Sequence, residues 1–101
     1  MTTNDFIEYL VGKIQFNLDE FNTAKTSRGI DESALRYLYV ATSISDVADT
    51  LLECDDLLIN NVNRHYIEMC ARRVFCTTWN IADSEELANV FHEQYAKRRN
   101  V

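Results

Sequence analysis

Apolar residues recur at three- and four-residue steps along the first quarter of the chain, and this spacing constrains the fold more than any other feature. They are Ile7, Leu10, Val11, Ile14, Leu18 and Phe21. Because an α-helix has about 3.6 residues per turn, these side chains share one helical face. A second series consists of Tyr37, Val40, Ile44, Val47 and Leu51, widened by Ala34, Ala41, Ala48 and Leu52. The second helix is expected to be the central one, because its apolar stripe is broader.

Residues that favour helix ends bracket both series. Thr3 or Asn4 is expected to cap the first helix. Gly29 is expected to end that helix in a conformation with positive φ. Asp31 or Ser33 is expected to begin the second helix, so a short corner joins the two.

Two further helices are predicted in the second half of the chain. Asn60 or Asn61 is expected to cap a third helix that runs through Cys76. Asp83 or Ser84 is expected to cap a fourth, because a Glu follows Asp83 at the spacing of a capping box. Its buried face is expected to hold Leu87, Val90, Phe91 and Tyr95.

The sequence has no proline and only two glycines among 101 residues. This argues against a turn-rich β fold, because turns rely on both residue types. Hydrophobic residues make up 47% of the chain, enough for one core. We therefore expect an all-α fold, a compact bundle of four helices with five as the alternative count. Residues 1–101 are expected to form a single domain, with residues 97–101 as its basic C-terminal tail.

The net charge of −6 is unevenly distributed. Three of the ten bases are Lys97, Arg98 and Arg99, so residues 1–96 hold all 16 acids and only seven bases. Nucleic acids and anionic membranes attract clustered Lys and Arg, so direct binding to either is not expected. No apolar run approaches the ~20 residues that span a bilayer. The N-terminus has no signal-peptide pattern, and the three cysteines are irregularly spaced. We therefore expect a cytoplasmic protein with reduced thiols.

Metal sites and catalytic centres have little support. The cysteines and histidines lack the C-x-x-C or H-x-x-x-H spacing of zinc ligands, so no metal, cofactor or catalytic residue is assigned. Asp46-x-x-Asp49 and Glu53-x-x-Asp56 do have the step with which all-α nucleoside-triphosphate pyrophosphohydrolases hold Mg²⁺. Both pairs fall in one short segment, however, and the first helix supplies no matching pair. A Mg²⁺-dependent pyrophosphohydrolase is therefore the distant alternative to a non-enzymatic protein.

Residues 45–56 hold five acids in twelve positions and no base. On a helical wheel Asp46, Asp49 and Glu53 fall within about 60° of one another, nearly opposite the second apolar series. Like charges at this spacing repel by a few tenths of a kcal/mol. A solvated helix face usually mixes the two signs of charge, and this one does not. The sequence therefore predicts an outward acidic stripe that a cationic partner would stabilise.

The acidic surface is expected to extend beyond the end of the helix, to Asp56 in the connection that follows. A helical Asp55 would point into the apolar series, which is costly for a carboxylate. We therefore expect the helix to end near Cys54 and to leave Asp55 and Asp56 in the connection that follows. The next three residues are expected to pack beneath that connection: Leu57, Leu58 and Ile59.

These residues lead to two functional hypotheses. Carboxylates at near-phosphate spacing can occupy a surface built for a nucleic-acid backbone. The favoured function is a non-enzymatic protein-binding module that uses the acidic face, defined as Asp46, Asp49, Glu53 and Asp56. Its sharpest form is a small acidic inhibitor of nucleic-acid-handling machinery, such as a phage anti-CRISPR or anti-restriction protein, whose partner presents a basic nucleic-acid-binding surface. The alternative is a helical homo-oligomeric structural or assembly subunit.

A few other residues carry narrower expectations. Gly12 lies inside the first helix, where a close approach by a neighbouring helix would explain it. Arg73 is expected either in a buried ion pair or in contact with a partner. Tyr39 and Trp79 are expected to lie off the core, where such side chains often anchor interfaces. The basic tail is expected to complement the negative end of the last helix, or to contact a phosphate or an acidic partner.

Overall fold

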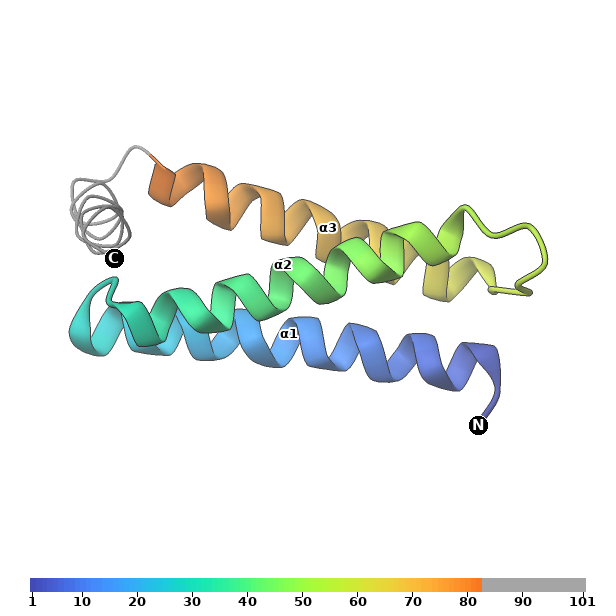
Figure 1. Ribbon diagram of the computed structural model, residues 1–101, viewed down its shortest axis with the longest axis horizontal. Coiled ribbons are helices and arrows are strands. Elements are labelled where there is room, and N and C mark those ends of the chain that lie inside the picture. The colour runs from blue at the N-terminus through green and yellow to red at the C-terminus, as the bar shows by residue number, and fades with distance from the viewer. Residues whose placement is uncertain (83–101) are drawn as a thin grey trace, which may run out of the picture.

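The computed structural model describes residues 1–82, which form three α-helices. They are α1 (Thr3–Arg28), α2 (Glu32–Leu52) and α3 (Asn61–Ala82). Consecutive helices run antiparallel, so α1 and α3 point the same way (Figure 1). The all-α class is confirmed, but residues 1–82 hold three helices where a bundle of four or five was expected. The fourth helix predicted from Asp83 or Ser84, and the basic tail, lie outside the described residues.

The first helix is capped by Thr2, earlier than the expected Thr3 or Asn4. Thr2 Oγ1 accepts a hydrogen bond from the Asp5 N–H at 3.1 Å. The Thr2 N–H donates in return to Asp5 Oδ2, also at 3.1 Å. This reciprocal pair is a capping box. The expected caps were wrong because only Thr2 has an acid three residues further on.

A short corner joins α1 to α2, as expected. Gly29 ends α1 with φ 85°, and its N–H donates to the Lys25 carbonyl at 3.0 Å. Asp31 caps α2 and accepts the Ala34 N–H at 2.7 Å. Arg28 Nε donates to the second Asp31 oxygen at 3.0 Å. Because both donors favour the carboxylate, first the Ala34 N–H and then Arg28, the pKa of Asp31 is lowered.

The third helix begins as expected and ends later. Asn60 Oδ1 accepts the Asn63 N–H at 2.8 Å, so Asn60 is the cap. The helix continues to Ala82, whereas the sequence predicted an end at Cys76. Ile81 explains the difference, because it is buried and continues the apolar spacing of the helix. Helical structure is favoured as long as it adds buried side chains.

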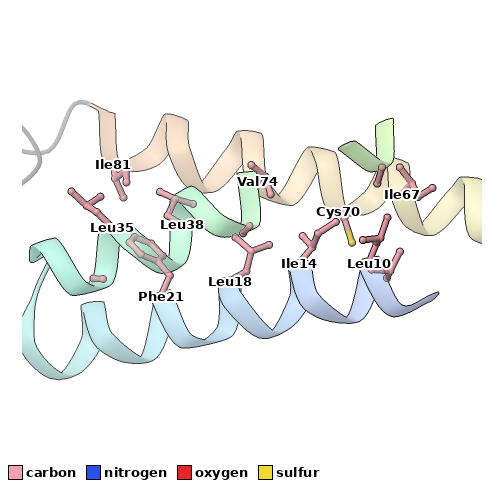
Figure 2. Packing of buried hydrophobic residues seen from close by; sticks show 14 of the residues in the cluster. Leu10, Ile14, Leu18, Phe21, Leu35, Leu38, Ile67, Cys70, Val74 and Ile81 are labelled. Carbon is pink, nitrogen blue, oxygen red and sulfur yellow. The ribbon is translucent and has the colours of Figure 1, made fainter. Parts of the chain in front are cut away.

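The core is a single layer of side chains between the three helices. The predicted apolar series of α1 is confirmed, since all six of its residues are buried. Figure 2 shows how α3 closes the core over α1 and α2. The residues that α3 contributes are Ile67, Cys70, Val74 and Ile81. No helix in the described part of the chain has the length and hydropathy needed to cross a bilayer.

The prediction for the apolar stripe of α2 is confirmed in part. The fully buried residues are Ala34, Leu35, Leu38, Ala41, Ser45 and Ala48, and they include all three predicted alanines. The predicted residues that pack half-buried against this core are Tyr37, Ile44, Leu51 and Leu52. Val40 and Val47 belong to the predicted series but are 44% and 52% exposed. The distance between packed helices depends on the side chains at the contact, and small ones permit a close approach. The helix therefore presents Ala41, Ser45 and Ala48 to the core, and its valines face solvent.

Gly12 does not lie against a neighbouring helix, so that expectation was wrong. A Cβ atom added to Gly12 would meet nothing within 4 Å. The residue instead lines an open groove of about 390 Å³ between α1 and α3, together with Glu8 on α1 and Val62 and Tyr66 on α3. The three helices therefore leave the position of Gly12 unexplained.

Candidate protein-binding surface

The acidic face lies at the end of α2 and in the connection to α3. Asp46 and Asp49 belong to the last turns of α2, and Glu53 is its C-cap. Asp56 follows in the connection, and all four residues are exposed. The helix ends at Leu52, slightly before the expected position. The structure thus places the four candidate residues, all exposed, within positions 46–56 at the end of α2 and in the connection.

These carboxylates have no cationic partner within residues 1–82. The ion pairs of this part of the chain are Arg28–Asp31, Arg36–Glu32 and Arg73–Asp19. The last turn of α2 also has no basic residue. Because the C-terminus of a helix is the negative end of its dipole, Asp49 and Glu53 are repelled by the helix end and by each other. The acidic face therefore carries uncompensated negative charge.

The acidic face lies on the flank of α2 that is turned away from α1. Leu51 marks the opposite flank, since it lines a hollow with Phe6 and Ile7 of α1. At about 100° per residue, the three helical acids lie about 140–160° around the helix from Leu51. They also lie beside the buried stripe of α2 rather than opposite it, because that stripe is rotated from its predicted position. The acids therefore border the edge of the buried stripe that lies away from Leu51.

Leu58 adds an apolar side chain beside these acids. Leu57 and Ile59 pack against the core, as expected of the connection. Leu58 was expected to do the same, but it is 85% exposed. It lies two positions after Asp56, and Leu57 and Ile59 on either side of it already pack against the core. A large apolar side chain is thus exposed to solvent within three positions of two exposed acids in the sequence.

Asn4 holds the connection in place from α1. Its Nδ2 donates to the Leu58 carbonyl at 3.1 Å. Its Oδ1 accepts the Asn60 N–H at 3.0 Å and the Asn63 Nδ2 at 2.9 Å. These bonds fix the backbone at and just after Leu58. Sequence reasoning treated Asn4 and Asn60 only as helix caps, and nothing local in the sequence indicates that they meet.

The predictions for Arg73, Trp79 and Tyr39 are confirmed only in part. Arg73 forms an ion pair with Asp19, with 2.6 Å between Nη2 and Oδ1. Both side chains are exposed, so the pair ties α3 to α1 at the surface and not in the core. Trp79 and Tyr39 lie off the core, as expected. The Trp79 ring stacks on Phe75 with 6.1 Å between centroids, so α3 presents two exposed aromatic side chains together.

The thiols differ in exposure. Cys54 and Cys76 are exposed, whereas Cys70 is buried in the core. Burial raises the pKa of the Cys70 thiol, and the nearby charge of Arg73 opposes this shift only in part. The raised pKa favours the protonated thiol, which is less reactive than the thiolate. Within residues 1–82, no three His, Cys, Asp or Glu side chains are grouped so that they could hold a metal ion.

No protein-family model, curated protein or solved structure matches this chain. Its function is therefore inferred from the chemistry of its surface. Uncompensated carboxylates lie at the end of α2 and in the connection to α3, together with an exposed leucine whose backbone carbonyl accepts a hydrogen bond from Asn4.

Proposed function

We propose that the chain is a non-enzymatic protein-binding module whose acidic face engages a basic, nucleic-acid-binding surface of a partner protein. The supporting observation is that Asp46, Asp49, Glu53 and Asp56 are exposed and have no cation in contact within residues 1–82. Their mutual repulsion and the dipole of α2 both oppose this arrangement in the free chain. Lys and Arg side chains of a partner would relieve both, because complementary charge favours the bound state.

Leu58 gives this surface an apolar anchor. Protein interfaces combine an apolar centre with a polar rim, and a few anchors supply most of the binding free energy. The Asn4 hydrogen bonds hold the Leu58 backbone before a partner arrives. Less conformational entropy is then lost on binding. Leu58 and the acidic face thus form one preorganised interface.

In the sharpest form of the proposal, the module is an inhibitor that mimics nucleic acid. Neighbouring carboxylates on one helix face lie about 5–6 Å apart, which approximates a row of backbone phosphates. Surfaces that bind such backbones do so largely through charge. The module would then exclude nucleic acid from its partner, as a phage anti-defence protein does. Partner binding should compete with DNA or RNA and weaken as salt rises.

Charge reversal tests the proposal. The variant Asp46→Lys/Asp49→Lys/Glu53→Lys/Asp56→Lys should lose capture of the partner from native-cell extract while its far-ultraviolet circular dichroism stays helical. A matched control, Glu8→Lys/Glu20→Lys, reverses two acids of α1 and should retain capture. The captured protein should be released by added polyanion. Full capture by the fourfold variant would contradict the proposal, because the acidic face would then serve solubility and not partner binding.

Self-association is the second candidate, and the groove beside Gly12 favours it. Val62 and Tyr66 stand exposed on its α3 wall. Tyr9 and Phe16 stand exposed around an adjoining hollow on α1, which Gly12 also lines. A helix of a second copy could pack there, where the missing Cβ of Gly12 leaves room. Light scattering over a dilution series distinguishes the candidates, because a monomer at every concentration would remove the homo-oligomer.

A further inference from the structure

The solvent side of α1 carries an open hollow of about 330 Å³ that is lined by this helix alone. The lining residues are Glu8, Tyr9, Gly12, Lys13 and Phe16. Two of them are large and exposed, Tyr9 by 52% and Phe16 by 56%. Exposed apolar surface of this kind often marks an interaction site. The arrangement of the five residues indicates what binds there.

Tyr9, Gly12 and Phe16 form a second seam on α1, here called the outer seam. They follow one another at steps of three and four residues, and at about 100° per residue they lie within about 60° of one another. The same geometry places them nearly opposite Ile7 and Ile14, which are fully buried in the core. A three-four step is the spacing by which one helix packs against another along a coiled-coil seam. The outer seam is therefore suited to a helix from outside the chain.

Opposite charges flank the outer seam. Glu8 lies about 70° to one side of its centre and Lys13 about 70° to the other. The ion pairs within residues 1–82 include neither of them. Lys13 follows Glu8 by five positions, which is the step between the flanking positions g and e that form ion pairs across two parallel helices. The outer seam is thus complementary in charge to a parallel copy of itself.

We propose that the outer seam binds α1 of a second copy of this chain, with the two helices parallel and related by a two-fold axis. Glu8 of each copy pairs with Lys13 of the other, so the symmetry forms the ion pair twice. Tyr9 and Phe16 of the two copies pack together between these pairs. An antiparallel arrangement would instead place each flank beside its own equivalent, Glu8 beside Glu8 and Lys13 beside Lys13. Like charges repel, so the flanks specify the parallel orientation.

The α1–α3 groove accommodates the side chain of Lys13 from the second copy. This groove of about 390 Å³ lies on the Glu8 flank of the outer seam, and its α3 wall includes Val62 and Tyr66. Both wall residues are exposed in the single chain. A lysine can lay its methylene groups along apolar surface while its ammonium group reaches a charge. Lys13 of the second copy can therefore cover Val62 and Tyr66 and still reach Glu8.

The dimer also accounts for Gly12, which has no evident role within one copy. A Cβ atom at this position would meet nothing within 4 Å in the single chain. Glycine inside a helix is unfavourable relative to alanine. At the centre of the outer seam, however, the missing side chain leaves space between Tyr9 and Phe16. The aromatic rings of the second copy can occupy that space.

This dimer deepens the self-association candidate and rests on it, but it does not depend on the acidic face. The acidic face lies on the flank of α2 that is turned away from α1, so it stays exposed in both copies. The dimer would present the acidic face twice. Two linked sites bind a partner with matching sites more tightly than one site does.

Sedimentation equilibrium of the full chain tests the dimer. The weight-average mass of the wild type should rise towards twice that of one chain as the concentration increases from about 1 μM to 1 mM. Glu8→Lys and Lys13→Glu should each weaken association about tenfold, because each variant replaces two attractions by two repulsions. Circular dichroism should show that both variants remain helical.

Two rescue experiments make the test specific to this pairing. The double variant Glu8→Lys/Lys13→Glu restores opposite charges across the outer seam and should associate like the wild type. An equal mixture of the two single variants should also associate, because every pair between the two different chains is then attractive. The matched control Lys25→Glu reverses another base of α1, beyond the outer seam, and should associate like the wild type.

Several outcomes would overturn the dimer. A wild type that stays monomeric up to about 1 mM would do so. Single variants that associate as strongly as the wild type would also do so, since an antiparallel dimer or another contact surface would leave them unaffected. These results leave the acidic-face proposal standing. Full partner capture by the fourfold acidic-face variant would contradict that proposal and leave the dimer standing.

Discussion

Asn4 and Leu58 lie 54 positions apart in the sequence, yet Asn4 Nδ2 donates to the Leu58 carbonyl at 3.1 Å. The same side chain accepts the Asn60 N–H through its oxygen. One residue in the first turn of α1 thus holds the connection that carries the exposed leucine. The apolar anchor of the proposed interface depends on a residue outside the acidic stretch.

Replacement of Asn4 by Ala should destabilise the fold by about 1–3 kcal/mol, because three side-chain hydrogen bonds are lost and each contributes on the order of 1 kcal/mol. Asn63 is 3% exposed, and its Nδ2 would keep only the 3.4 Å bond to the Asn4 carbonyl. Urea denaturation measures the loss. Asn22→Ala, at an exposed position of the same helix, should change stability little. Equal effects of the two substitutions would show that the Asn4 bonds contribute nothing specific.

Asp31 should contribute a pH-dependent part of the stability. Its pKa in the folded chain is lowered from 3.8 by the Ala34 N–H and by Arg28. Because a depressed pKa favours the folded state only while the group is ionised, this contribution is present above the ordinary pKa and is lost as pH falls through the folded one. Asn also caps helices, so Asp31→Asn should keep the cap and lose the charge.

The urea midpoints of wild type and Asp31→Asn should therefore differ most above about pH 4, near the ordinary Asp pKa. They should converge as the solution is acidified below that value. A gap that stays constant down to strong acid would mean that the substitution acts through the cap geometry and not through the charge.

Cys70 should react more slowly with a thiol reagent than the other two cysteines. Cys70 is buried and its pKa is raised by burial, whereas Cys54 and Cys76 are exposed. Since the thiolate is the nucleophile, a dithionitrobenzoate assay should show two fast thiols and one slow one. Cys70→Ala should remove only the slow phase, and denaturant should make all three fast. Three equal rates in the native chain would contradict this placement.

The features that sequence reasoning predicted correctly are local. The buried face of α1 follows from the spacing of its own side chains, and Gly29 and Asp31 identify the α1–α2 corner from residue type alone. Each requires only the periodicity of one helix or the chemistry of one turn. The same reasoning identified the exposed acids of α2, because a run of carboxylates is costly to bury.

The features that it missed depend on contacts between distant segments. The buried stripe of α2 is rotated to include Leu35, Leu38 and Ser45 and to exclude Val40 and Val47, and such a rotation depends on how neighbouring helices pack. A pattern of apolar residues ranks Val47 above alanine and so misplaces the stripe. Leu58 is exposed because Leu57 and Ile59, on either side of it, occupy the space against the core. Asn4 can bond the Asn60 N–H only because the start of α3 lies beside the start of α1. None of these is encoded within a single helix.

Gly12→Ala should stabilise the chain by about 0.5–1 kcal/mol, because alanine loses less conformational entropy than glycine in a helix. The structure leaves room for the methyl group, with nothing within 4 Å of an added Cβ. Gly29→Ala is the matched contrast and should destabilise by about 1–3 kcal/mol, since φ at Gly29 is 85°. Thermal unfolding of both variants at several concentrations measures the two effects. A destabilising Gly12→Ala whose effect grows with concentration would show that a second copy packs into the α1–α3 groove, and it would raise the homo-oligomer above the single-chain module.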